Sequence, residues 1–110
     1  MGRITADAIR IRISQIIRNQ MHELQWNGIK IEIVEKIDYV QPILSNDFKY
    51  EGSGDYDFSG HIAFMVKEAN NEYGTHREKY KISPCCKMSI KEMEDDFKIE
   101  IPFPISLQKI

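Results

Sequence analysis

Cysteine and histidine are the side chains of this chain that could bind a metal ion or act as a nucleophile. The two cysteines, Cys85 and Cys86, are adjacent, and His61 and His76 lie on predicted strands. Structural zinc sites use paired spacings, and neighbouring residues of a strand point to opposite faces. A thiol nucleophile also needs a histidine in reach, and the spacing of the histidines in the sequence does not place one beside either cysteine. We therefore expect two free thiols, with Cys86 inward and Cys85 outward, and no metal or cofactor.

Carboxylates lie in two segments where they could bind a cation or transfer a proton. The loop around Gly52 and Gly54 is acidic, yet it lacks the third glycine of a dinucleotide site and the spacing of a calcium loop. The run from Glu92 to Asp96 lies in a predicted turn, whereas acid–base catalysis needs carboxylates that converge on a pocket. We interpret both segments as solvated turns, and no constellation of residues indicates an enzyme.

The elements that position these side chains are clearest between Tyr56 and Val66. Even positions in this stretch, Gly60 excepted, are large and apolar, and most odd positions are polar. A period of two indicates a strand with one buried face. Pro84 is expected to break the pattern, since proline removes a backbone donor. Alternation predicts strands over residues 29–39, 48–50, 56–68, 75–82, 86–90 and 97–103.

One long amphipathic helix is predicted over residues 5–25. Isoleucines at Ile9, Ile13 and Ile17 fall on one side of a helical wheel, while Ile11 falls on the other. Thr5 is suited to cap the first turn. The basic residues form no stripe, and we expect them to lie on a solvated face.

Together these elements predict an α+β domain that spans residues 1–110. One N-terminal amphipathic helix would pack on a four- to six-stranded antiparallel meander sheet, because short turns pair neighbouring strands. By architectural analogy, the arrangement is similar to a cystatin-like roll, in which a curved sheet grips a helix.

Composition narrows the class of protein. The 110 residues are 42% apolar and 29% charged, with a formal net charge of -2, which is typical of a globular domain. That balance supplies no strong attraction to nucleic acid, so we do not expect a nucleic-acid partner. Charged residues interrupt the apolar residues at the start of the chain, so the sequence predicts no secretory signal, and no apolar run is long enough to cross a membrane. We expect a cytoplasmic protein.

The strongest candidate site is the solvent-facing side of the predicted strands. His61, Ala63 and Met65 occupy outward positions of one strand, and Arg77 and Lys79 occupy outward positions of the next. Apolar residues on a wet face can mark an interaction surface. We therefore expect a small non-enzymatic protein-binding module, of the inhibitor, immunity or accessory type, acting through this sheet face or an edge strand. The partner would be another protein or a second copy in a homodimer.

An alternative is a small-molecule site or an enzyme with a pocket between helix and sheet. A curved sheet that grips a helix can leave an apolar cavity at its open end. Its polar groups would come from tyrosines. A cavity with a buried ionisable residue would favour this alternative over the binding surface. The candidate tyrosines are Tyr39, Tyr50, Tyr56 and Tyr80.

Overall fold

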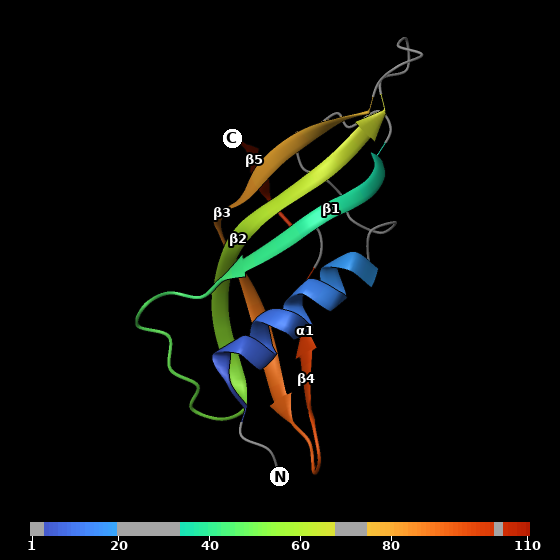
Figure 1. Cartoon of the computed structure of the whole chain (residues 1–110). Coiled ribbons are helices and arrows are strands. Elements are labelled where there is room, and N and C mark those ends of the chain that lie inside the picture. The colour runs from blue at the N-terminus through green and yellow to red at the C-terminus, as the bar shows by residue number, and fades with distance from the viewer. Residues whose placement is uncertain (1–3, 20–33, 68–74, 103–104) are drawn as a thin grey trace.

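The computed structural model describes residues 4–19, 34–67, 75–102 and 105–110. One helix lies against one side of a curled antiparallel sheet (Figure 1), which confirms the predicted α+β class. The predicted helical residues 20–25 lie outside the described residues. The elements are α1 (Ala6–Asn19), β1 (Val34–Ile43), β2 (Gly54–Lys67), β3 (Thr75–Glu92), β4 (Phe97–Glu100) and β5 (Leu107–Lys109).

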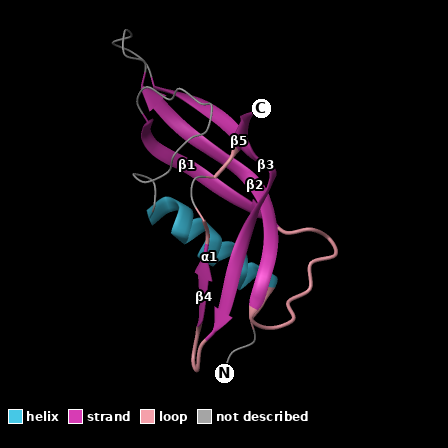
Figure 2. Ribbon diagram, turned by 180° about the vertical axis from the view of Figure 1, so that it is seen from behind, coloured by secondary structure: helices cyan, strands magenta, loops and turns pink. Residues whose placement is uncertain are grey.

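The sheet is a meander in the order β1-β2-β3-β4, and β5 adds a second partner to β3. All four pairings are antiparallel. β3 is 18 residues long, so two short strands share one of its edges. β4 pairs with its end at Ser89–Glu92, and β5 pairs with Tyr80–Ile82. In Figure 2, β3 can be followed from the segment that pairs with β5 to the end that pairs with β4.

Two predicted features of the strands are wrong. Residues 48–50 form no strand. Phe48 and Tyr50 pack instead through their rings, which lie 5.6 and 5.7 Å from the ring of Tyr56. Pro84 does not end a strand, because β3 continues through it. It lies in a bulge where Phe58 faces Cys86 and Gly60 faces Ile82, so the ladder to β2 needs no donor from it.

Gly60 marks the same irregularity on β2. Its φ of 156° is one that L side chains rarely adopt, and a Cβ there would lie 2.5 Å from the backbone oxygen of Gln41. The backbones of β1 and β2 therefore approach more closely at this point than any side chain allows. Close approach and the bulge together bend the sheet, since a bulge increases local twist.

The core lies between α1 and the inward side of the sheet. Ile9, Ile13 and Ile17 are fully buried, as their spacing predicted, whereas Ile11 is 59% exposed. Most even positions between Phe58 and Phe64 of β2 and between Tyr80 and Ile90 of β3 join them in one apolar cluster. The backbone N–H of Ala8 donates to Thr5 Oγ1 at 3.1 Å, which is the predicted cap.

Arg12 departs from the solvated face expected for the basic residues. Its guanidinium donates to the backbone oxygen of Phe97 at 2.7 Å and lies 4.5 Å from the centre of the Phe97 ring. It also pairs with Asp96 at 3.2 Å. These contacts join α1 to the start of β4. The pKa of the Asp96 carboxyl is lowered, mainly by the hydrogen bond from the backbone N–H of Phe97 and then by the hydrogen bond from Arg12.

Candidate interaction surface

The residues predicted to bind a partner lie at adjacent positions on the outer side of the sheet. In the β2–β3 register, Met65 faces Arg77, Ala63 faces Lys79 and His61 faces Lys81. Directly opposed residues of an antiparallel pair share one face. The structure thus brings the predicted set together and adds Lys81. We call His61, Met65, Arg77, Lys79 and Lys81 the basic face.

Ala63 differs from the expectation of an exposed apolar patch, because its side chain is fully buried. It points away from the core, since its neighbours Ile62 and Phe64 both face inward. Its cross-strand neighbours are Tyr39 and Lys79, whose side chains are much longer than its methyl group. Ala63 is therefore the floor of the basic face, and exposed apolar surface must come from other residues.

An ion pair crosses this floor. Arg77 Nε on β3 lies 2.7 Å from Asp38 Oδ2 on β1, and β2 runs between these two strands. A register shift between Ile37 and Tyr39 makes the link possible. Ile37 and Val40 both pack on the core, so the bulge turns Asp38 and Tyr39 outward together.

Charge is unevenly distributed along the molecule, which measures 52 by 25 by 20 Å. Arg77, Lys79 and Lys81 are outward positions near the start of β3, where Asp38 supplies a carboxylate. The turn between β3 and β4 contains Glu94 and Asp95, and it lies at the opposite end of the molecule in Figure 1. A net charge near zero therefore conceals a basic region and an acidic region.

A polar cluster that the sequence analysis did not identify lies on the other side of β3. Tyr80 Oη donates to Glu78 Oε2 at 2.7 Å, and His76 Nε2 lies 2.9 Å from Glu78 Oε1. Lys109 of β5 approaches the same carboxylate at 3.9 Å. The hydrogen bonds from Tyr80 and then His76 lower the pKa of Glu78. Burial, followed by the same Tyr80–Glu78 bond, raises the pKa of Tyr80 to about 12.

The arrangement of this cluster anchors the last strand. Glu78 has only 19% of its side chain exposed, and its partners come from β3 and β5.

Two grooves formed by described residues lie on this part of the molecule. One of about 340 Å³ lies on β3 and β4, away from the cluster, and one of about 320 Å³ borders the cluster at His76, Glu78 and Lys109. The carboxylate of Glu78 is already bound by hydrogen-bond donors, so Glu78 is poorly suited to accept a proton from a substrate.

We expect this cluster to make stability depend on pH in the acidic range. Because the folded pKa of Glu78 lies below its ordinary value of 4.5, the contribution is complete above that value and is lost as the pH falls through the folded pKa. Urea unfolding at a series of pH values measures it. Glu78→Gln should be less stable than the wild type at neutral pH and should show a flatter decline below pH 4.5. Equal slopes in the two proteins would contradict this role.

The four tyrosines of the alternative pocket do not meet at one place, although the rings of Tyr50 and Tyr56 lie 5.7 Å apart. Tyr39 faces outward, and Tyr80 is bound to Glu78. Tyr50 donates to Glu92 at 2.6 Å, and Tyr56 donates to the Gly52 backbone oxygen at 2.6 Å. The buried ionisable groups among the described residues are the Tyr80 hydroxyl, which is bound to Glu78, and the Cys86 thiol. Neither residue lines any of the grooves described below or above.

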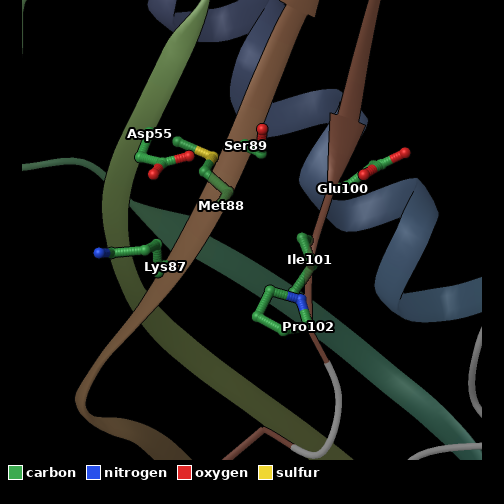
Figure 3. A pocket seen from close by; sticks show the side chains of 7 residues that line it. All are labelled: Asp55, Lys87, Met88, Ser89, Glu100, Ile101 and Pro102. Carbon is green, nitrogen blue, oxygen red and sulfur yellow. The ribbon is translucent and has the colours of Figure 1, made fainter.

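A groove of about 490 Å³ lies where the chain leaves β4 and separates from β3. Met88, Ile101 and Pro102 form its apolar part. Lys87 and Glu100 extend to opposite sides of it in Figure 3. A ligand site needs a few polar groups that converge, and these two diverge. The groove therefore has an apolar wall, and two of its four polar side chains, Lys87 and Glu100, point apart.

The cysteines have the predicted orientation, with Cys85 exposed and Cys86 buried, and both are free. Burial is the main cause that raises the pKa of Cys86 to about 11, so its thiol stays protonated at neutral pH. Among the described residues, no group of three histidine, cysteine or acidic side chains could hold a metal ion.

Comparison of the chain with protein-family models, with curated proteins and with solved structures finds no match. No helix in the described ranges is sufficiently long and apolar to span a membrane. The functional argument therefore depends on the geometry and charge of the basic face.

Proposed function

We propose that this chain is a small non-enzymatic protein-binding module whose basic face docks on an acidic protein surface. The supporting observation is the set of cations at adjacent outward positions, Arg77, Lys79 and Lys81. Half-buried Met65, which faces Arg77, supplies exposed apolar surface among them. An apolar centre with a charged rim is the usual anatomy of a protein interface.

The sheet face is a better candidate than the edge strand. β1 is one of the outer strands of the sheet, but two register shifts interrupt its pairing, and it contains Pro42. Bulges and prolines are features that protect a sheet edge from pairing with another chain. The basic face has no such protection.

The proposal includes a cellular setting and a mode of action. Two free cysteines fit a reducing compartment, so we place the protein in the cytoplasm. Blocking or presenting another protein requires no chemistry of its own, which fits an inhibitor, an immunity-type protein or an accessory protein. The partner is an acidic protein, and a second copy of this chain in a homodimer is one such partner. The cystatin-like roll remains an analogy of architecture.

Affinity capture with matched variants tests this function. Tagged wild type should recover one stoichiometric acidic protein from an extract of the native source, identified by mass spectrometry. Met65→Glu and Lys79→Glu should lose that protein, while their free energies of unfolding stay within about 0.5 kcal/mol of wild type, as for other surface changes. Lys91→Glu is the control, because it makes the same charge change at the far end of β3, where Lys91 is exposed.

Three outcomes would contradict the proposal. The first is equal recovery by wild type and by Lys79→Glu. The second is capture that disappears after nuclease treatment, which would indicate a nucleic acid held by the same cations. The third is a small molecule retained through purification with no protein recovered.

A further inference from the structure

We propose that the surface covering the basic face is the turn between β3 and β4 of a second copy of this chain. We call its residues Met93, Glu94, Asp95 and Asp96 the acidic turn. This inference rests on the function proposed above, because it names the partner of the same face.

Charge complementarity is the first argument. Glu94 and Asp95 are exposed at the tip of the acidic turn. Asp96 is engaged within its own chain by Arg12. On the basic face, Arg77 is engaged by Asp38, while Lys79 and Lys81 are exposed beside it. Each copy therefore presents two acidic and two basic side chains that are available for a contact between chains.

Apolar complementarity is the second argument. Met93 is 51% exposed, although it lies among carboxylates. Met65 lies among the cations of the basic face, beside the closed floor at Ala63. Methionine side chains adapt to irregular surfaces, so Met93 suits the centre of the face while its acidic neighbours reach the rim.

The shape of the molecule determines how the contact closes. Lys79 lies 14 residues before Met93, so the basic face and the acidic turn lie at most roughly 46 Å apart at about 3.3 Å per residue. The start of β3 and the β3–β4 turn lie at opposite ends of the molecule in Figure 1. Two copies placed antiparallel bring each turn onto the other's face. The result is a closed pair with two identical contacts.

Charge-reversal variants test this arrangement by complementation. Wild type should sediment as a dimer at low salt and dissociate as salt is raised, since screening weakens exposed charge pairs. In the face variant, Lys79→Glu/Lys81→Glu, the acidic turn of one copy would meet an acidic face on the other copy. In the turn variant, Glu94→Lys/Asp95→Lys, a basic turn would meet the native basic face. Each alone should be monomeric, with a dissociation constant raised at least about tenfold.

Mixing the two variants is the decisive measurement. The acidic face of one then meets the basic turn of the other, and the remaining face and turn keep their native charges. A 1:1 heterodimer should form with an affinity near that of wild type. Its formation also shows that both variants are folded.

The inference is overturned by wild type that stays monomeric at low salt, by a mixture that does not associate, or by assemblies larger than a dimer. Failure here is distinguishable from failure of the proposed function. A monomeric wild type whose capture of another acidic protein is lost in Lys79→Glu leaves the function standing. Capture that is insensitive to Lys79→Glu overturns the function itself.

Discussion

Gly60→Ala is expected to lower the free energy of unfolding by about 2 to 4 kcal/mol, from backbone strain and overpacking together. At a φ of 156° an alanine is strained, and its Cβ would meet the Gln41 backbone oxygen at 2.5 Å. β1 and β2 would have to separate where the sheet bends. Urea unfolding measures the loss. Because small domains are stable by only about 5 to 15 kcal/mol, the effect is a large fraction of the total.

Two other glycines serve as controls for this prediction. Gly52 has a φ of 97° but open space around its Cβ position, so Gly52→Ala should cost about 1 to 2 kcal/mol from strain alone. Gly54 has open space around its Cβ position and does not have a positive φ, so Gly54→Ala should change stability by less than about 0.5 kcal/mol. A loss at Gly60 no larger than that at Gly52 would show that the close backbone approach is unimportant.

Ile13→Ala is expected to destabilise the fold by about 2 to 5 kcal/mol, through lost burial and the cavity left behind. Ile13 is fully buried in the middle of α1, between Ile9 and Ile17, and these side chains fill the space against the sheet. The midpoint of urea unfolding should fall with little change in its slope.

Ile11→Ala is the matched control on the same helix, with the same atoms removed. Ile11 is 59% exposed, so its replacement should change the free energy of unfolding by less than about 0.5 kcal/mol. Alanine also has the higher helix propensity, which offsets part of any loss. Similar destabilisation by the two variants would mean that α1 does not bury the side expected here.

Much of the candidate surface was predictable because alternation assigns strand residues to a face. His61, Met65, Arg77 and Lys79 were placed outward by their odd positions, and the register confirms them as neighbours. The burial of Ala63 was not predictable, because it depends on which residues lie opposite it on both sides. Nor was the Asp38–Arg77 pair, since a bulge in β1 reverses the local face assignment.

The polar cluster around Glu78 shows the same limit. His76 and Glu78 interrupt the apolar inward positions of β3, and that interruption was the available signal in the sequence. Lys109 is remote in the chain and reaches the cluster only because β5 pairs with Tyr80–Ile82. A pattern within one strand contains no information about that pairing.

Periodicity alone determined the secondary-structure class, the inward side of α1 and the inward side of β2 and β3. These follow from local backbone geometry, which repeats every 3.6 or every two residues whatever the rest of the chain does. Tertiary structure decided where Pro84 could be accommodated, why Gly60 must lack a side chain, and which charges meet on the outer face. Those depend on contacts between residues far apart in the chain, which form only when the strands are in register.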